Sequence, residues 1–547
     1  MAPSGFCSSS MIMRNAEKVY KKNAGGRPSG LLLTSMLKGY GEREKRGEPC
    51  MVAQETARKF TFDVGWVFVS SVVAMGAGLL IRILLGNYFD ASGLGAYAMV
   101  LTIWGIVTLT TGAGAPGALI KYVAECADDK DTRDSLVSAS ILNGFIMGLA
   151  ATILFIIAAP WLESIFNIPD LANLLRIASL SFPFVTLNNV FVSYLNGVRR
   201  MKWYAAFEIY RKGIVLVFTM ILVWLGMGIP GAVWALVIAP VSVTAAQLVI
   251  HKRLFSYTLA RYKECTKKLF GFGSKLFAAN IIGQINTQAA TLLIGFYLLD
   301  SDVGVYAVAL MFFNLLIMVP LSIQRITYPA ISEYFSKQRF QSIKIMVEST
   351  MKYSFLYLSL MCLLIFFYVD DIISIIFPGK ATFISAVDTI IILVMMTIFY
   401  ASLIPIGSIF SSIGKPDISM ILSIVRFPIT VLLSIILIPS NIQFHGIQLN
   451  GINGAAIAFG LTEIISAFFV IIFIKKLIPI TIQFKSLYIG TITLFCTILF
   501  AYASITYLPI SSNLLGGIII LIFFVGIFPL GVISRKEIDD FICMLKK

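Results

Sequence analysis

The chain has 547 residues, of which 58% are hydrophobic and only 13% are charged. A soluble domain carries about 25% charged residues, so this composition excludes an ordinary soluble protein. The apolar residues come in repeated blocks of about 20, the length that an α-helix needs to cross the hydrocarbon core. They do not alternate with polar residues as the strands of a membrane barrel do. The sequence therefore predicts an all-α polytopic membrane protein.

In chain order, residues 1–60 come first, and they are polar and basic. They are expected to form a cytoplasmic tail that is either disordered or upstream of a true start at Met51. About fourteen transmembrane helices are expected to follow. Six of them form an N-lobe over 61–255, with spans near 64–86, 94–117, 136–159, 172–195, 209–227 and 231–251.

A cytoplasmic linker at 256–276 then leads into a second group of six helices. This C-lobe covers 277–477, with spans near 277–299, 303–324, 352–370, 384–407, 418–439 and 453–474. Two further helices, near 487–507 and 513–533, and a cytoplasmic tail occupy 478–547.

The net charge of +15 could indicate nucleic-acid binding, but its placement indicates membrane topology instead. Basic residues gather in the loops of one side: Lys121, Lys130, Arg133, Arg199, Arg200, Lys202, Lys252, Arg253, Arg261, Lys263, Lys267, Lys268, Lys337, Arg339 and Lys344. The loops of the other side are mostly acidic: Asp90, Glu163, Asp170, Asp300, Asp302, Asp370 and Asp371. Cytoplasmic loops are the basic ones. The sequence therefore predicts a cytoplasmic-membrane protein with both termini in the cytoplasm, in contact with membrane lipid and without a nucleic-acid partner.

Nothing in the sequence indicates an enzyme. The only histidines are His251, at a helix end, and His445, in a loop. No phosphate-cradling loop or acidic pair at catalytic spacing is visible. The seven cysteines have neither metal-ligand spacing nor the pattern of a disulfide framework. We therefore expect no catalytic residue, no metal site and no cofactor, apart from a Na⁺ or H⁺ ion that could be coupled to transport.

The two lobes are related by an internal repeat. LGNYFDASGLGAYAMVL at 85–101 matches IGFYLLDSDVGVYAVAL at 294–310, and IYRKGIVLVFTMIL at 209–222 matches IVRFPITVLLSIIL at 424–437. GIPGAVWA at 228–235 matches GINGAAIA at 451–458. Glycine-rich turns recur in many membrane proteins, but these three matches occur in the same order. Because six spans separate the equivalents, the repeats are parallel and a substrate cavity is expected between the lobes.

Several of these stretches resemble a known family. They are Gly93-Leu-Gly-Ala-Tyr97, the inner turn at 195–204, Ser412-Ile-Gly-Lys-Pro416, the turn at 451–458 and the tail at 534–540. Over 61–547 the chain resembles the multidrug/oligosaccharidyl-lipid/polysaccharide exporter superfamily, and within it the polysaccharide-biosynthesis branch of Wzx-like O-antigen flippases.

The resemblance implies a MATE-like fold that flips a polyprenyl-pyrophosphate-linked oligosaccharide by alternating access. Such transport would serve surface polysaccharide or glycoprotein biosynthesis, with glycan-assembly enzymes as possible partners. Two alternatives stay open. One is a cation-coupled drug antiporter, although that branch typically has twelve helices. The other is a flippase of the peptidoglycan precursor lipid II, which also has fourteen.

Two ionisable residues inside predicted spans are functional candidates, because such groups are expensive in a bilayer. Glu463 lies near the middle of its span, where it is either an ion-coupling carboxylate or a helix-packing residue. Arg82 lies about one turn from the outer end of the first span. It either contacts the substrate pyrophosphate through its planar guanidinium or reaches the interface. The resemblance favours the first role, since lipid-linked-glycan flippases often line the cavity with arginine.

Other charged residues lie nearer the ends of spans. Arg176 and Asp388 occupy comparable places in the two lobes and could form a gate pair, although each could simply reach interfacial water. Arg325, Arg211 and Arg426 are interpreted as topology charges. Among these, Arg325 is also a substrate candidate, at the cytoplasmic entrance.

A polar helix face is a further candidate for binding sugars. Gln284, Thr287 and Gln288 share one face through their three- and four-residue spacing. Asn188 and Asn189 in the fourth span could play the same part. The bland alternative is that these side chains hydrogen-bond between helices.

Overall fold

The computed structural model describes residues 48–126, 129–251, 256–407, 409–413, 415–440, 443–444, 447–477, 484–507 and 512–527. Most of the predicted N-terminal tail and all residues after Ile527 lie outside this part. The chain divides into two units, Met1–Gly65 and Trp66–Lys547. The described cavities, ion pairs and contacts between helices lie within the second unit.

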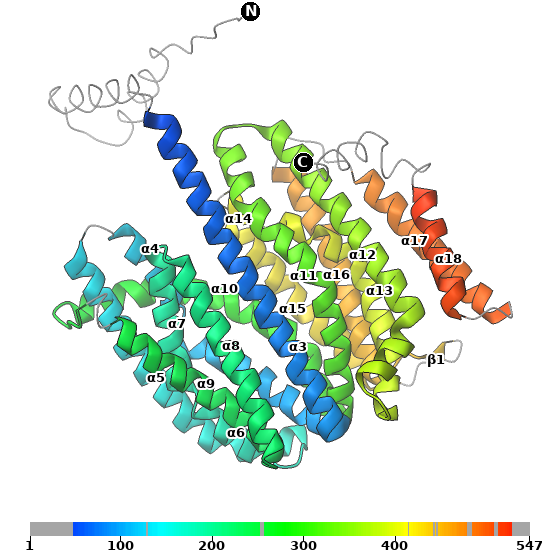
Figure 1. Cartoon of the computed structure of the whole chain (residues 1–547), viewed down its shortest axis with the longest axis horizontal. Coiled ribbons are helices and arrows are strands. Elements are labelled where there is room, and N and C mark those ends of the chain that lie inside the picture. The colour runs from blue at the N-terminus through cyan, green and yellow to red at the C-terminus, as the bar shows by residue number, and fades with distance from the viewer. Residues whose placement is uncertain are drawn as a thin grey trace, which may run out of the picture. The chain divides into compact units, whose positions relative to one another are not determined.

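The described chain is almost entirely helical, which confirms the predicted all-α fold (Figure 1). Its helices are α3 (Glu48–Thr111), α4 (Ala115–Glu125), α5 (Lys130–Phe166), α6 (Leu171–Ser179), α7 (Phe182–Gly197), α8 (Met201–Trp224), α9 (Gly228–His251), α10 (Tyr262–Tyr297), α11 (Asp300–Ser336), α12 (Phe340–Ile376), η1 (Ala381–Ser385), α13 (Ala386–Gly407), α14 (Ile409–Ser412), α15 (Pro416–Leu437), α16 (Gly451–Leu477), α17 (Lys485–Tyr507) and α18 (Ser512–Ile527). One hairpin, β1 (Gln443–Phe444) with β2 (Ile447–Gln448), pairs Gln443 with Gln448 and Phe444 with Ile447.

Length and apolar composition allow eight of the described helices to cross a membrane, and a ninth if the pair α6 and α7 is one span. α3 contains two of the predicted spans, broken at Asp90, where φ is 61°. The second of these spans ends earlier than predicted. Gly114, at φ 75°, precedes a new helix that has Pro116 in its first turn, a position that proline favours. The predicted fourth span is bent by 44° between α6 and α7.

The helices gather into two groups (Figure 1). In the first, α5 packs on α6 and α7, and α8 packs on α9. In the second, α13 lies between α11, α12 and α16, and α15 packs on α16. α10 contacts both groups, through α4 and α5 on one side and α15 on the other. The last two helices, α17 and α18, pack on each other and on α12.

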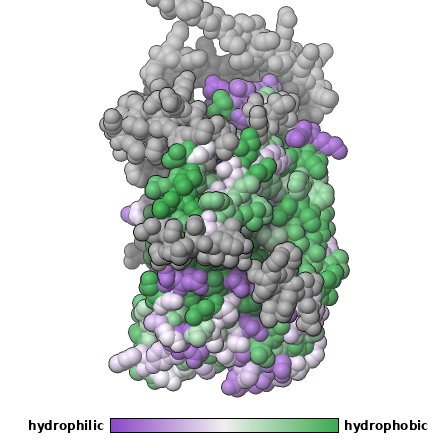
Figure 2. Space-filling model, turned by 90° about the vertical axis from the view of Figure 1, so that its right-hand side faces the viewer, coloured by the Kyte–Doolittle hydropathy of each residue, from purple (hydrophilic) through white to green (hydrophobic). Residues whose placement is uncertain are grey.

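The surface formed by the last helices is apolar. Ile492, Leu499 and Phe500 on α17 and Leu521 and Val525 on α18 are all exposed. Figure 2 views this side of the molecule and shows apolar residues over its middle, with polar residues at its lower end. Apolar side chains that face outward can contact the hydrocarbon tails of lipids, so they need no protein partner. This surface agrees with a multi-pass membrane protein.

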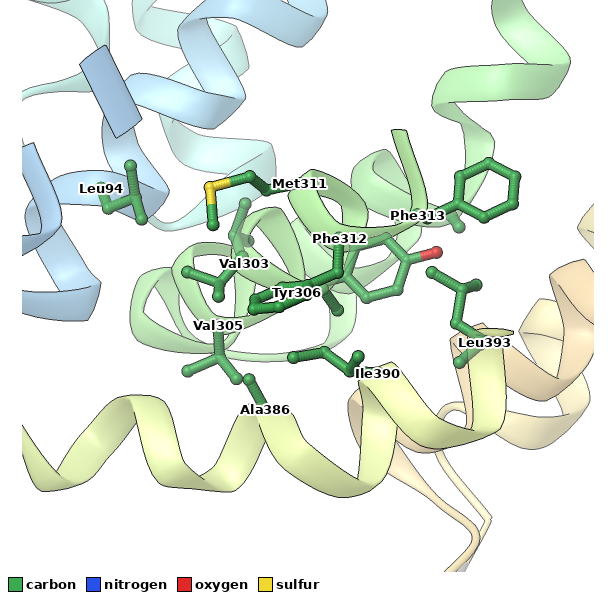
Figure 3. Packing of buried hydrophobic residues seen from close by; sticks show 14 of the residues in the cluster. Leu94, Val303, Val305, Tyr306, Met311, Phe312, Phe313, Ala386, Ile390 and Leu393 are labelled. Carbon is green, nitrogen blue, oxygen red and sulfur yellow. The ribbon is translucent and has the colours of Figure 1, made fainter. Parts of the chain in front are cut away.

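A buried cluster joins the two lobes where α3 crosses α11. Tyr306 is 1% exposed and lies among Val303, Ile390 and Leu393, with Leu94 of α3 nearby (Figure 3). Since lipid tails are as apolar as these side chains, such a contact is held by close packing rather than by removal of water.

The backbones of the two lobes approach closely at a glycine seam, formed by Ala91, Gly95, Asp300 and Gly304. A Cβ on Gly95 would lie 1.8 Å from the Asp300 carbonyl oxygen, and one on Gly304 would lie 1.9 Å from the Ala91 carbonyl oxygen. In the internal repeat Gly95 corresponds to Gly304 and Ala91 to Asp300. Each glycine therefore faces the carbonyl oxygen of the residue that is equivalent to the other glycine's contact. The two lobes therefore meet across a pseudo-two-fold axis, as parallel repeats predict.

Candidate functional site

A cavity of about 270 Å³ lies between the lobes, enclosed by α3, α8, α9 and α11. Three cationic side chains line it, Arg82 from α3 and Arg211 and Lys212 from α8. From the second lobe, α11 supplies Asn314, whose side chain can hydrogen-bond. The rest of the wall is mainly apolar. We call this space the cationic cavity.

The helices present these charges in a fixed arrangement. Gly78 lies one turn before Arg82 on α3, and a Cβ there would be 3.9 Å from Arg82 Nη1, so the guanidinium lies over this turn of the helix. Arg211 Nη2 donates to Glu208 Oε2 at 2.6 Å, one turn earlier on α8. In the part of the chain that the structure describes, Arg82 and Lys212 have no carboxylate partner. Unpaired cations inside a membrane are expensive and mark ion or substrate sites.

Arg211, which the sequence suggested as a topology charge, lines the cationic cavity. The predicted span began at 209, whereas α8 begins at Met201, so Arg211 lies almost three turns inside the helix. Lys212 was missed altogether. The signal in the sequence that could have found Lys212 is the pair of adjacent cations at 211 and 212.

A second space, the polar cavity, has a volume of about 380 Å³ and lies between α3, α4, α7, α8 and α10. Its walls carry Asn189, Asn196, Asn280 and Gln284, together with Glu208. Gln284 was a predicted substrate residue and lies in this wall.

The other predicted polar residues make contacts between or within helices in this conformation. Gln288 accepts from Thr102 Oγ1 at 3.3 Å, and Thr287 donates to the Gln284 backbone oxygen at 2.8 Å. Asn188 is buried, and its amide donates to the Pro240 carbonyl at 3.3 Å. Its oxygen accepts from Thr244 Oγ1 at 2.8 Å. Asn188 thus joins α7 to α9.

Glu463 lies in the second lobe, away from both cavities. It is 1% exposed and forms an ion pair with Arg426 of α15. Arg426 Nη1 also donates to Tyr400 Oη at 3.3 Å, and its guanidinium carbon lies 5.2 Å from the centre of that ring. Arg426, which the sequence suggested as a topology charge, thus neutralises a carboxylate on the neighbouring helix. Sequence alone could not reveal this pairing.

The remaining candidates are exposed. Arg325 hydrogen-bonds to Ser71 Oγ of α3. Arg176 Nη1 donates to Asn173 Oδ1 at 3.4 Å, within its own helix. Among the described residues no ion pair joins Arg176 to Asp388. A gate between these two residues therefore stays a prediction for another conformation.

Comparison with known proteins places this geometry in context. A family model described as polysaccharide biosynthesis protein matches residues 60–335, and one described as MatE matches 276–436. The uncharacterized membrane protein MJ1068 of Methanocaldococcus jannaschii is 22% identical, over 88% of this chain and 98% of its own.

Two further relatives have descriptive names. The succinoglycan biosynthesis transport protein of Rhizobium meliloti is 25% identical over 55% of this chain and 59% of its own. A probable low-salt glycan biosynthesis flippase of Haloferax volcanii is 22% identical over 83% and 88%. Among solved structures, a lipid II flippase in an inward closed conformation matches with a TM-score of 0.67 and 19% identity, over 84% of this chain and 97% of that one.

Proposed function

We propose, from the premise that the chain belongs to the polysaccharide biosynthesis protein family, that it flips a polyprenyl-pyrophosphate-linked oligosaccharide across the membrane by alternating access. The observation that carries this proposal is the cationic cavity between the lobes. Its cations, Arg82, Arg211 and Lys212, outnumber the single carboxylate beside them, Glu208. An anionic group bound there would compensate the excess charge.

A pyrophosphate suits this cavity better than a single carboxylate does. Guanidinium groups pair phosphate oxygens through two parallel hydrogen bonds, and an ammonium adds a point charge. Arg82 and Arg211 come from different helices, α3 and α8, so two phosphate groups can each have an arginine. The apolar part of the wall suits the first prenyl units. The same excess of positive charge disfavours a cationic drug as substrate.

The names of relatives support the class of substrate. One relative is a succinoglycan transport protein, another a glycan biosynthesis flippase, and a third, from Escherichia coli, a lipid III flippase with 29% identity over 24% of this chain. By this proposal the protein lies in the cytoplasmic membrane with both termini in the cytoplasm, as the basic loops predict. Glycan-assembly enzymes would supply its substrate on the cytoplasmic side.

The energy source belongs to the proposal too. The membrane potential supplies about 2.3 kcal/mol per charge per 100 mV, which favours export of an anionic headgroup. Coupling to Na⁺ or H⁺ would involve Glu463. Because Arg426 already neutralises that carboxylate, a coupled cation would have to replace the guanidinium.

Transport in proteoliposomes tests the proposal. The probe is a fluorescent polyprenyl-pyrophosphate oligosaccharide, and the variants are Arg82→Ala, Arg211→Ala and, as a matched control, the exposed Lys263→Ala. Each cavity variant should slow flipping about tenfold or more, since a hydrogen bond to a charged group contributes about 1.5–3 kcal/mol. The control should flip at the normal rate. If the intact protein moves no such lipid but exports an organic cation against a Na⁺ or H⁺ gradient, the proposal is wrong.

A further inference from the structure

One ion pair separates the polar cavity from the cationic cavity. Glu208 lines the polar cavity, Arg211 lines the cationic cavity, and 2.6 Å separates their paired atoms. Consecutive residues of α3 divide in the same way, because Trp104 lines the cationic cavity and Gly105 the polar one. The polar cavity therefore lies directly beside the group that would bind an anion on Arg211.

The walls of the polar cavity match a neutral, hydrogen-bonding ligand. Each of the four amides, at Asn189, Asn196, Asn280 and Gln284, offers two N–H donors and an acceptor oxygen. Within the described residues, none of these amide groups makes a hydrogen bond. Sugar hydroxyls both donate and accept, so amides satisfy them from either side. The volume of 380 Å³ lies within the range of about 300–1,000 Å³ that is usual for small-molecule sites.

Glu208 gives the site a preference. An ionised carboxylate only accepts hydrogen bonds, whereas Arg211 has five N–H donors that can be shared between two anions. When a phosphate accepts some of the hydrogen bonds of Arg211, the Glu208 oxygens become available to the group next to that phosphate. A hydroxyl, amide N–H or ammonium of a sugar would be bound there, and a sugar carboxylate would be repelled.

We infer that the polar cavity is the subsite for the sugar attached to the pyrophosphate, and that Glu208 selects a neutral or amino sugar over a uronic acid. The inference rests on the proposed function and extends it from the anionic group to the glycan. Glu208 thereby acts as a specificity residue, and the amides of α7 and α10 act as binding residues.

Three fluorescent polyprenyl-pyrophosphate lipids test the inference with the full chain in proteoliposomes. The first carries no sugar, the second one N-acetylhexosamine, and the third one hexuronic acid. The variants are Glu208→Gln and the pair Asn189→Ala with Gln284→Ala. Glu264→Gln and Gln341→Ala, both exposed, are matched controls. The intact protein should prefer the second lipid to the third by about tenfold or more, because close like charges disfavour binding strongly.

The variants should change preference rather than only rate. Glu208→Gln should bring the uronic-acid lipid to within about threefold of the N-acetylhexosamine lipid. The paired amide variant should lower the rate ratio between the second and first lipids. If every variant changes all three rates equally, or if none changes any ratio, the inference is wrong while the proposed function stands. If the intact protein moves none of the three lipids but moves the oligosaccharide-linked probe, the inference is wrong and the proposed function stands. If it moves none of the four lipids, the proposed function is wrong and the inference falls with it.

Discussion

Gly95→Ala is expected to hold the lobes apart at the glycine seam. The new Cβ would lie 1.8 Å from the Asp300 carbonyl oxygen and 2.8 Å from its carbon. Ordinary van der Waals contact begins near 3.4 Å, so the seam must open by at least 1.6 Å. The atoms on the far side belong to the backbone, and no rotamer change relieves the clash.

The expected energy follows from packing. Overpacking a close contact costs about 1–3 kcal/mol. If the clash exists only in the closed-seam conformation, the population with an open seam rises by about 5–150-fold. Gly304→Ala should have nearly the same effect, since its Cβ would lie 1.9 Å from the Ala91 carbonyl oxygen. The double variant should be less than additive, because one opening of the seam relieves both clashes.

Disulfide formation between Ser92→Cys and Asp300→Cys, in a background without the native cysteines, measures closure of the seam. These side chains lie in contact across it, with Ser92 Oγ donating to Asp300 Oδ2 at 2.5 Å. Cross-linking should fall in either glycine variant and stay normal in Gly76→Ala, where a Cβ meets nothing within 4 Å. Undiminished cross-linking together with normal transport in Gly95→Ala would refute the reasoning.

Two other predictions concern stability and separate structure from transport. Arg426→Ala should destabilise the protein by about 3–5 kcal/mol in thermal unfolding in detergent, because it leaves Glu463 buried without its partner, and the double variant Arg426→Met with Glu463→Gln should regain most of that loss. If the double variant also regains transport, Glu463 has a structural role. If it folds without transporting, the coupling role is supported. Gly114→Ala should lower the unfolding temperature, because φ is 75° there and a Cβ would lie 1.9 Å from the Gly273 carbonyl oxygen. The control Gly271→Ala, with open space around it, should leave the unfolding temperature unchanged. Equal unfolding temperatures of the two variants would contradict this reasoning.

The fold was largely predictable, because the length of an apolar block is dictated by the bilayer rather than by tertiary contacts. Helix ends were less predictable. The break at Asp90 occupies a single residue, and the bend between α6 and α7 leaves the hydrophobic pattern continuous. Both depend on how the chain packs and not on local composition.

The candidate site was predictable one residue at a time. Arg82 and Glu463 became candidates because an ionisable group inside an apolar block is conspicuous. The contacts of Arg211 and Arg426 could not be predicted, the first because α8 extends beyond its apolar block and the second because its partner lies on another helix. A single sequence shows the depth of a charge but does not show which charge faces it.

The internal repeat relates Arg211 of the first lobe to Arg426 of the second, and the two arginines have different carboxylate partners. The matched stretches 209–222 and 424–437 make Arg211 equivalent to Arg426, and the matched turns at 228 and 451 make Pro240 equivalent to Glu463. In the second lobe the carboxylate neutralises its arginine. In the first lobe proline stands at the carboxylate's place and lines the cationic cavity together with Arg211. Arg211 is paired instead with Glu208, one turn earlier on its own helix. The two halves therefore keep the arginine but take its carboxylate from different places, and only in the first lobe does the pair lie beside the two cavities.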